Sequence, residues 1–484
     1  MKPMTPQRRI QLIALPLALL GLAIGVLLMS FDPVMIARRS STSSIARSSR
    51  GNDVPVPLMV SFTSDELATI RTLAPLPSPP EDPTNAVALL PRAAWLGQSL
   101  FFDPRLSSTG NIHCGTCHDP ARWFVDLLPV AQTIGVGNRN TPTLLHTAHS
   151  RWFAWDGRAD SLWSMSLLPI ENESEMGGNR VAIVRLLAND LQLRAAYEAV
   201  FGQIPPIDAS RRSGLNLPRE ARPVVDDPQD PMHVAWESMR EASRDTVNRI
   251  YANVGKALAA YQSLLNDGGS TFDRFVEGLS EDGLTSTDPM TQGELMGLKL
   301  FIGKAGCIRC HSGPMFTDEE FHNIGVPPRE GKVPRDPGRY RGVELLKRSP
   351  FHAAGFFSDG RESSRGIISE SLVNSPENWG RFKTPSLRSV IKTPPYMHNG
   401  LFNTLDEVVR FYSTLEGAVQ LDHHQETVLE PLHLTEDEIR DLVAFLGALH
   451  GPGPPDELMG PPRRPFGGVA ATSSGDSNGA AASP

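Results

Sequence analysis

The chain has 484 residues, 40% of them hydrophobic and 21% charged, which is ordinary for a globular protein that buries a core. Its net charge of −8 provides no basic footprint, and this argues against nucleic acid as a partner. The 42 prolines and 41 glycines, together with few alternating apolar runs, predict a mainly α-helical fold with long loops, in which a bound cofactor supplies part of the core.

The N-terminal 30 residues have the pattern of a membrane-directed segment. Basic residues precede a run from Leu12 to Met29 that contains no charged or hydrogen-bonding side chain. This run is longer than the usual signal-peptide core of about 7 to 15 residues, and no clear cleavage site follows it. Residues 1–30 are therefore expected to be a transmembrane signal anchor or, alternatively, a cleaved signal peptide. In both cases the rest of the chain is exported, and the periplasm is the expected location.

Residues 31–63 include a Ser- and Arg-rich stretch from Ser40 to Asn52, and they are expected to form a tether. The folded part is expected to begin near Ser64, where a partial helix-capping pattern precedes Leu67. At the other end, Pro, Gly, Ser and Ala dominate, so residues 451–484 are expected to be a disordered tail.

Two short motifs use all four cysteines of the chain. They are Cys114-Gly115-Thr116-Cys117-His118 and Cys307-Ile308-Arg309-Cys310-His311. The Cys-x-x-Cys-His spacing is that of covalent c-type haem attachment. Two thiols three positions apart can both add to the vinyl groups of one porphyrin, and the next residue brings an imidazole to the iron. The sequence therefore predicts two covalently bound c-type haems.

Zinc and disulfides are the alternatives for these cysteines. Paired Cys-x-x-Cys motifs that bind one zinc ion are usually about 15 to 20 residues apart, far closer than Cys117 and Cys307. A redox or structural disulfide would explain each cysteine pair, but not the histidine that follows it.

A similar segment precedes each motif. Leu96 to Phe101 and Met296 to Phe301 both carry a glycine and a Leu-Phe pair at matching offsets. This internal repeat predicts two tandem cytochrome c-like domains, at residues 64–280 and 281–450. The long irregular stretch 313–381 is expected to fold over the second haem or to contact a partner.

The C-terminal region predicts two capped helices. Thr404 and Thr435 are each followed three residues later by Glu, which is the capping-box pattern. In the first helix one face carries Leu405, Val408, Val409 and Tyr412. In the second, one apolar face is formed by Ile439, Leu442, Val443 and Leu446.

Further motifs accompany the cysteine pairs in a fixed order. They are Arg139-Asn140-Thr141-Pro142-Thr143, Trp155-Asp156-Gly157-Arg158-Ala159, Glu175-Met176-Gly177, Thr384-Pro385-Ser386-Leu387-Arg388 and Pro395-Tyr396-Met397-His398-Asn399-Gly400. With these motifs the chain resembles the bacterial dihaem cytochrome c peroxidase and MauG family over residues 90–450. The resemblance implies that hydrogen peroxide reacts at the first haem, and that the second haem stores or relays oxidising equivalents.

The resemblance makes His118 the proximal ligand of the first haem. The family's peroxidases have a distal histidine where this chain has Val136, which cannot bind iron. A vacant distal site, as in MauG, would leave this haem open to peroxide. The alternative is that His146 or His149 folds in as a ligand instead.

Glu175 matches the family's distal acid, a carboxylate that can shuttle a proton between the peroxide oxygens. The alternative is that Glu175 belongs to a solvated acidic loop. Met165 stands where much of the family has Gln, so one hydrogen-bonding side chain is missing from the expected pocket.

Trp155 matches the tryptophan that lies between the two haems in the family, where it relays electrons; the alternative is packing alone. The resemblance also assigns Asn140, Thr393 and Pro395 to a calcium site between the domains.

At the second haem, the resemblance makes His311 the proximal ligand and leaves the sixth ligand to decide the function. MauG has a tyrosine where this chain has Tyr412, whereas the peroxidases have a methionine. A phenolate ligand stabilises high oxidation states and lowers the reduction potential. The alternatives are that Tyr412 only packs in the core, or that Met397 is the ligand.

The leading hypothesis is a MauG-like dihaem oxidoreductase that uses hydrogen peroxide to oxidise a protein or peptide substrate by long-range electron transfer. One rival is a cytochrome c peroxidase that draws electrons from a small cytochrome. The other is a non-enzymatic dihaem electron carrier.

Overall fold

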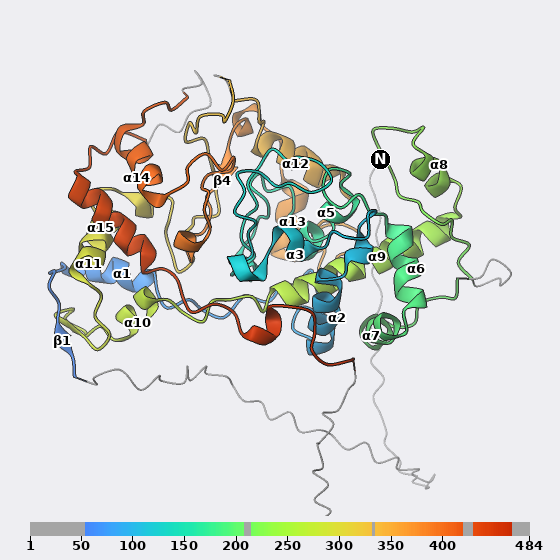
Figure 1. Ribbon diagram of the computed structural model, residues 1–484, viewed down its shortest axis with the longest axis horizontal. Helices are drawn as coiled ribbons and strands as arrows, with labels where there is room; N and C mark the ends of the chain where they lie inside the picture. Colours follow the sequence, from blue (N-terminus) through green and yellow to red (C-terminus); the bar gives the residue numbers. More distant parts are fainter. Residues whose placement is uncertain (1–53, 208–213, 332–333, 420–428, 467–484) are drawn as a thin grey trace, which may run out of the picture. The chain divides into compact units, whose positions relative to one another are not determined.

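The computed structural model describes residues 54–207, 214–331, 334–419 and 429–466 (Figure 1). All of them belong to the second of two units, Asn52–Pro484. The expected anchor at residues 1–30, most of the tether and residues 467–484 lie outside the described residues. In the part that is described, no helix combines the length and apolar character needed to cross a membrane.

The expectation of a mainly helical fold is confirmed for the described residues. The α-helices are α1 (Ser64–Thr72), α2 (Pro91–Phe101), α3 (Cys114–Cys117), α4 (Leu162–Met165), α5 (Leu168–Glu171), α6 (Arg180–Asn189), α7 (Leu191–Phe201), α8 (Pro231–Glu237), α9 (Glu241–Gln262), α10 (Thr271–Glu277), α11 (Gln292–Ile302), α12 (Arg339–Arg348), α13 (Ser364–Ser371), α14 (Leu405–Thr414) and α15 (Glu436–Gly447). Two antiparallel strand pairs accompany them, β1 (Val56–Pro57) with β2 (Thr285–Ser286) and β3 (Phe321–His322) with β4 (Phe382–Lys383).

A crossed helix pair occurs twice, and a glycine lies at each crossing. In the first pair α2 packs on α9, and a Cβ on Gly97 would lie 1.9 Å from the carbonyl oxygen of Ala257. In the second pair α11 packs on α15, and a Cβ on Gly297 would lie 1.9 Å from the carbonyl oxygen of Asp441. The glycine of the internal repeat is therefore explained by the close approach of two backbones.

Each helix pair forms the centre of its own hydrophobic core. The first core surrounds α2 and α9 and includes the fully buried side chains of Trp163 and Tyr261. The second core surrounds α11 and α15, where Phe301 and Phe445 lie 5.2 Å apart between ring centroids. Cys114 of the first motif packs against the first core, and Cys307 of the second motif packs against the second core.

The division of the chain between these cores differs from the expected boundaries. Ile70 and Leu73 lie at the end of α1, near the start of the described chain. They are buried in the second core, because α1 packs on α11. Phe351 and Phe357, from the later part of the chain, are buried in the first core. Sequence order predicts one core per half, but the chain starts in the second core and returns to the first.

The expected disordered tail is wrong for residues 451–466. The hydroxyl of Tyr261 donates to the carbonyl of Leu458 at 2.5 Å, and the indole N–H of Trp95 donates to the carbonyl of Arg464 at 3.0 Å. The ring of Phe466 also packs 5.3 Å from that of Trp95. Polar composition suggested disorder, but backbone carbonyls of this segment satisfy buried donors of the first core.

The predicted capping residues of α14 and α15 are confirmed, and the cap of α1 lies one residue earlier than predicted. Thr404 and Thr435 cap α14 and α15 in complete capping boxes with Glu407 and Glu438. At α1 the capping residue is Thr63, one position before the expected Ser64, because Thr63 has Glu66 three residues later. The stretch 313–381 is not wholly irregular, since it contains α12 and α13.

Candidate haem sites and the cavity between them

One cavity of about 1300 Å³ is lined by both cysteine motifs. Its wall includes all four cysteines together with His118 and His311. Pockets for small ligands usually reach about 1000 Å³ at most, so this cavity exceeds the range for one such molecule. No disulfide joins any two of the four cysteines, which does not support the disulfide alternative.

The two motif histidines are oriented in the same way. His118 Nδ1 lies 3.1 Å from the carbonyl oxygen of Phe124, and His311 Nδ1 lies 2.9 Å from that of Phe316. When Nδ1–H donates to a carbonyl, the other ring nitrogen, Nε2, is left to bind a metal. Burial also lowers the pKa of both histidines, which favours the neutral form that a metal needs.

The backbone around each acceptor carbonyl is also repeated. Phe124 and Phe316 both lie in the left-handed region, with φ of 60° and 52°. This conformation is uncommon for a residue with a bulky side chain. Its occurrence after both motifs indicates that the turn is shaped to bring a carbonyl to the histidine.

The grouping of side chains does not favour a four-cysteine zinc site. Burial raises the pKa of Cys114 and Cys307 to about 12. Within the described residues, the one group of at least three His, Cys, Asp or Glu side chains close enough to share a metal ion is Cys310, Asp318 and His322. Because this group contains a single cysteine, the residues do not form a four-cysteine zinc site.

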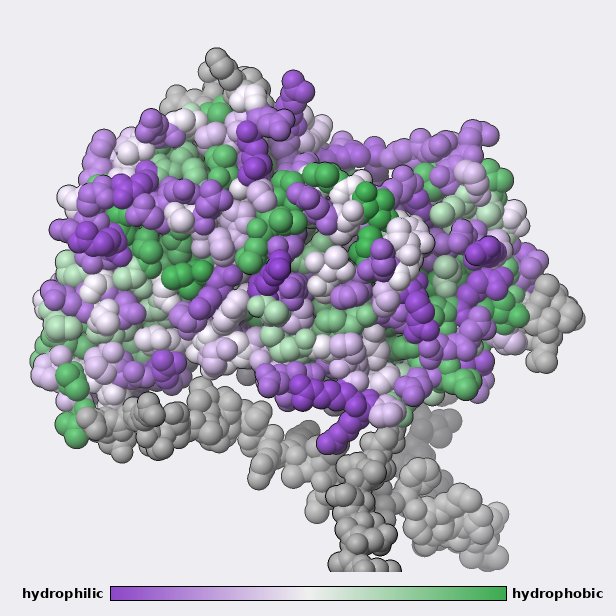
Figure 2. All heavy atoms as spheres, in the orientation of Figure 1, coloured by the Kyte–Doolittle hydropathy of each residue, from purple (hydrophilic) through white to green (hydrophobic). Residues whose placement is uncertain are grey.

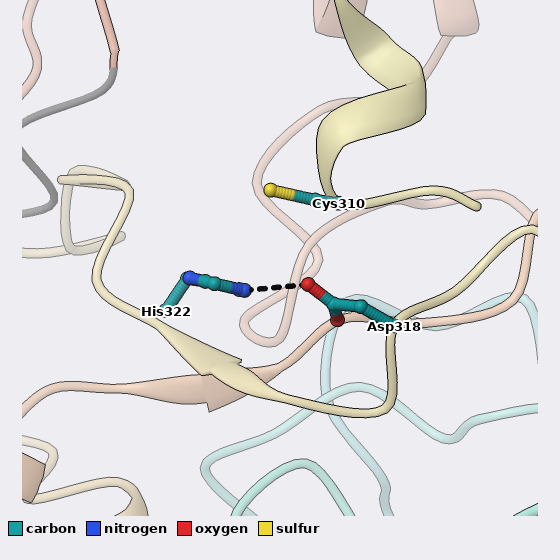
Figure 3. A group of neighbouring side chains, drawn as sticks. All are labelled: Cys310, Asp318 and His322. Atoms are coloured by element: carbon teal, nitrogen blue, oxygen red, sulfur yellow. Dashed lines mark hydrogen bonds and ion pairs between the residues drawn. The ribbon is translucent and has the colours of Figure 1, made fainter.

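Figure 3 shows that group beside the second motif. The side chains of Asp318 and His322 point toward each other, with 2.8 Å between Oδ2 and Nε2, and Cys310 points toward the same space. The thiol of Cys310 is one of the two that the second motif supplies for haem attachment. Asp318 and His322 therefore lie beside the second Cys-x-x-Cys-His motif.

The residues present thus fit two c-type haems. Each motif offers two thiols outside any disulfide and an imidazole whose Nε2 is left for iron, and all of these groups line one large cavity. His118 and His311 would be the proximal iron ligands, held by their Nδ1–carbonyl hydrogen bonds.

Glu175 and Val136 both line the part of the cavity near the first motif. Asn172 Nδ2 donates to Glu175 Oε1 at 2.6 Å. Burial raises the pKa of Glu175, against the opposing effects of Arg158 and of the Asn172 hydrogen bond. Glu175 is therefore partly buried on the cavity wall rather than part of a fully solvated acidic loop, and Met165 lines the same wall.

The exposed apolar side chains Leu127, Ile134 and Val136 belong to the loop that follows the first motif, and Val136 is 72% exposed. Figure 2 shows that apolar residues gather at several places among hydrophilic ones on one face of the molecule. Val136 thus lies both at the surface and on the cavity wall, where its side chain offers no iron ligand.

His146 and His149, the alternative ligands of the first haem, do not occupy equivalent positions. His146 lines the cavity, but its Nε2 lies 3.1 Å from Asp267 Oδ1, and both residues are buried. His149 is not among the described residues of the cavity wall. The Nε2 of His146 thus faces Asp267, and His149 stands back from the wall, so His118 is the histidine whose surroundings prepare it to bind iron at the first motif.

Trp155 is held by both halves of the cavity wall. Its indole N–H donates to the carbonyl of Asn140 at 2.9 Å, and its own carbonyl accepts from the backbone N–H of Lys383 at 2.8 Å. Asn140 follows the first motif and Lys383 follows the second. The structure therefore brings Trp155 into the cavity that both motifs share.

Tyr412 and its neighbours line the second part of the cavity as expected. Leu405, Val408, Val409 and Tyr412, which form the predicted face of α14, are all on the wall. Burial raises the pKa of Tyr412 well above its usual value, and the nearby thiols Cys307 and Cys310 raise it further. The hydroxyl makes no hydrogen bond with any described residue. Met397 lines the same cavity, so both proposed ligands are available.

The three residues assigned to calcium lie on the same wall. The side-chain nitrogen of Asn140 donates to the carbonyl of Leu128 at 2.9 Å, which leaves its amide oxygen as the atom suited to a cation. Among the described residues, no cluster of carboxylates accompanies Asn140, Thr393 and Pro395. Calcium therefore stays a prediction.

Sequence reasoning missed a second internal repeat. Thr141 to His146 and Thr384 to Ser389 align residue for residue, and His146 and Ser389 both adopt positive φ, 60° and 56°. Both side chains bind the carboxylate of Asp267, at 3.1 Å and 2.5 Å. The shared Thr-Pro start was the available signal, but nothing in the sequence points to Asp267 as the common partner.

The mainly helical fold and the two Cys-x-x-Cys-His sites on one cavity define a dihaem c-type cytochrome. Residues 91–281 match the family model described as di-haem cytochrome c peroxidase. The chain is 32% identical over 361 residues to the cytochrome-c peroxidase IdrP2 of Denitromonas iodatirespirans, covering 74% of this chain and 81% of that protein. The chain therefore belongs to the dihaem cytochrome c peroxidase and MauG family, whose members are haem-dependent oxidoreductases.

Other similar proteins include both a MauG protein and a diheme peroxidase. The chain is 29% identical to the methylamine utilization protein MauG of Methylorubrum extorquens, covering 79% of this chain and 83% of that protein. Among solved structures it is similar to the diheme peroxidase BthA of Burkholderia thailandensis, with 24% identity, a TM-score of 0.54 and coverage of 80% and 93%. A MauG-like protein associated with microbial copper homeostasis gives 23% identity, the same TM-score and coverage of 83% and 98%. At this identity the structural matches show the fold alone.

Proposed function

We propose that this protein is a MauG-like dihaem oxidoreductase, which uses hydrogen peroxide to oxidise a protein or peptide substrate by long-range electron transfer. Family membership supports two haems and a peroxidase-type reaction. The observation that carries the finer proposal is Tyr412, which lies on the wall near Cys307 and Cys310 and whose hydroxyl makes no hydrogen bond with any described residue. A tyrosine ligand stabilises the high oxidation states that storage of oxidising equivalents requires.

At the first site, the residues of this chain are arranged to handle protons. Haem bound there would supply iron that reduces hydrogen peroxide and takes up its oxidising equivalents. Asn172 holds Glu175 by Oε1, and Oε2 is left to take a proton from one peroxide oxygen and return it to the other. Burial raises the pKa of Glu175, and a carboxylate with a raised pKa accepts a proton more readily than an ordinary one.

Trp155 is proposed to pass electrons between the sites. Its indole N–H is held by the carbonyl of Asn140, and its backbone carbonyl is held by the N–H of Lys383. A fixed ring needs little reorganisation when it gains or loses an electron. The substrate would be oxidised at the surface, with its electrons moving inward to the two haem sites.

The rival enzymatic function is a cytochrome c peroxidase that receives electrons from a small cytochrome. It is favoured by the presence of Met397 on the same wall and by the peroxidases among the relatives. A plain electron carrier would need no role for Glu175. The extracytoplasmic location, with residues 12–29 as membrane anchor or cleaved signal, is part of the proposal.

Spectroscopy of the ferric protein tests the ligand assignment. We expect resonance Raman bands of an iron-tyrosinate bond and electron paramagnetic resonance of one high-spin and one low-spin haem. Tyr412→Phe should remove the tyrosinate bands and substrate oxidation, whereas Met397→Leu should leave both. Loss of a methionine-ligated signal in Met397→Leu, with no change in Tyr412→Phe, would instead assign the protein to the peroxidases.

A further inference from the structure

Two tryptophans, Trp152 and Trp155, line the cavity that both motifs share. They come from one loop, three positions apart. Either indole could give up an electron to an oxidised haem site, so the wall offers two routes. The charges around the two indole rings differ, and this difference makes one ring easier to oxidise than the other.

A buried guanidinium lies against Trp152. The guanidinium carbon of Arg339 is 4.3 Å from the ring centroid of Trp152, and on another side it is 4.1 Å from that of Phe321. Arg339 is only 4% exposed, and burial lowers its pKa to about 10, so it stays charged at neutral pH.

Among the described residues no carboxylate forms an ion pair with Arg339, although Asp156, Glu320 and Asp160 lie near enough to favour its charged form. Its Nη1 donates to the backbone carbonyls of Gly157 at 2.7 Å and Asp156 at 3.3 Å. These carbonyls satisfy the donors but carry no net charge. The positive charge beside Trp152 is therefore not cancelled at contact distance.

Two glycines create the space for this contact. A Cβ on Gly157 would lie 2.3 Å from Arg339 Nη1 and 2.4 Å from the ring of Phe321. A Cβ on Gly342, one turn along α12, would lie 2.0 Å from the carbonyl oxygen of Asp156. The backbone is thus shaped to let α12 deliver the guanidinium to this point.

Trp155 has the opposite environment. Its indole N–H donates to the carbonyl of Asn140, and among the described residues no cation stacks on its ring. An indole that loses an electron becomes positive. A carbonyl acceptor at the N–H stabilises that charge, whereas a guanidinium over the ring changes from an attractive to a repulsive partner.

We propose that Arg339 keeps Trp152 from being oxidised, so that electrons pass through Trp155 and the wall is protected from peroxide damage. The inference rests on the proposed function, in which hydrogen peroxide supplies the oxidising equivalents. Arg339 acts through the tryptophans and is therefore a positioning residue.

The damage that Arg339 prevents has a defined stoichiometry. If Trp152 is oxidised, its indole loses two electrons and hydrogen peroxide gains them. The O–O bond breaks, a ring C–H bond is replaced by C–OH, and one water molecule leaves. The product peptide is heavier by one oxygen atom.

The test is peptide mass spectrometry of the holoprotein after treatment with limiting hydrogen peroxide. In Arg339→Gln, which removes the charge, we expect about tenfold more oxygen addition at Trp152 than in the parent protein. Arg339→Lys keeps a cation and should keep Trp152 as protected as in the parent. Trp152→Phe combined with Arg339→Gln should remove the added product, which assigns it to this ring.

Three results would overturn the proposal. One is an Arg339→Gln protein that carries both haems, consumes peroxide and shows no increase at Trp152. The second is an Arg339→Lys protein in which oxygen addition at Trp152 rises about tenfold over the parent protein. If Arg339→Gln does not retain haem, the result for Arg339→Lys decides the test. The third is extensive oxidation of Trp152 in the parent protein. Failure of the proposed function is distinguishable, because it is read from the tyrosinate spectrum and not from Trp152.

Discussion

His146 and Ser389 occupy equivalent positions in the two repeated segments, and they bind the two oxygens of one buried carboxylate, that of Asp267. The backbone N–H of Gly451 reaches the same carboxylate at 3.0 Å. Asp267 therefore joins the link between α9 and α10, both repeated segments and the start of the C-terminal stretch. Although burial alone would raise it, these hydrogen bonds hold the pKa of Asp267 well below its usual value.

The first prediction concerns this carboxylate. Asp267→Asn should lower the free energy of unfolding by about 2 kcal/mol at pH 7, because hydrogen bonds to a buried charged group are replaced by weaker neutral ones. Thermal unfolding followed by circular dichroism measures the loss. Asp245→Asn, at an exposed position, is the control and should change stability by less than about 0.5 kcal/mol.

The pH dependence of this difference has a definite sign. A carboxyl group whose folded pKa is depressed contributes stability that is present above its unfolded pKa and is lost as the pH falls through its folded pKa. The difference between parent and Asp267→Asn should therefore be constant between pH 5 and 7 and shrink only below pH about 4. A difference that already shrinks between pH 7 and 5 would contradict the assignment.

The second prediction concerns the glycines at the helix crossings. Gly97→Ala and Gly297→Ala each place a methyl group against a backbone carbonyl, so each should destabilise the fold by about 1 to 3 kcal/mol. Gly97→Ala should weaken haem retention at the first motif more, and Gly297→Ala at the second. Unfolding curves and the haem content of each motif peptide measure the two effects.

Gly293→Ala is the matched control, because Gly293 lies on α11 one turn before Gly297. A Cβ there would meet only the side-chain oxygen of Asp441 at 3.3 Å and a methyl group at 3.9 Å. Alanine also has the better helix propensity. Equal destabilisation by Gly293→Ala and Gly297→Ala would show that the backbone contact is not the reason for the glycine.

Local patterns in the sequence were sufficient for the motifs and for several elements. The cysteine spacing predicted two haem sites, and both motifs line one cavity. The capping boxes at Thr404 and Thr435 located α14 and α15. The face that ends at Tyr412 followed from helical periodicity, since all four of its residues line the cavity. In these cases the controlling interactions lie within a few residues of one another.

The features that the sequence did not reveal depend on distant contacts. Ile70 packs in the second core because α1 crosses to α11, and no local pattern specifies that partner. Residues 451–466 lack helix or strand periodicity, but their carbonyls satisfy Tyr261 and Trp95. Arg339 comes from a stretch without a recognisable motif, so its contact with Trp152 becomes visible only in three dimensions.

The third prediction concerns calcium. If Asn140, Thr393 and Pro395 hold the ion, elemental analysis should find one calcium per chain, and chelation should slow the peroxide-driven reaction while both haems are retained. Asn140→Ala should lower the calcium content in the same way. A chain with full activity and no calcium after chelation would remove calcium from the list of cofactors.

The fourth prediction concerns proton transfer by Glu175. Glu175→Gln keeps the size of the side chain and can keep the contact with Asn172, but it cannot carry the proton. We expect the rate of reaction with hydrogen peroxide to fall by about 10² to 10⁴-fold, with both haems bound, as measured by stopped-flow absorbance.

Glu173→Gln is the control from the same loop, because the Glu173 side chain is exposed and pairs with Arg222 instead of lining the cavity. Its rate should match that of the parent protein. Because burial raises the pKa of Glu175, the parent rate should change with pH at a midpoint above the usual glutamate value of about 4.3, and Glu175→Gln should lose this step. An unchanged pH profile in Glu175→Gln would assign the proton transfer to another group.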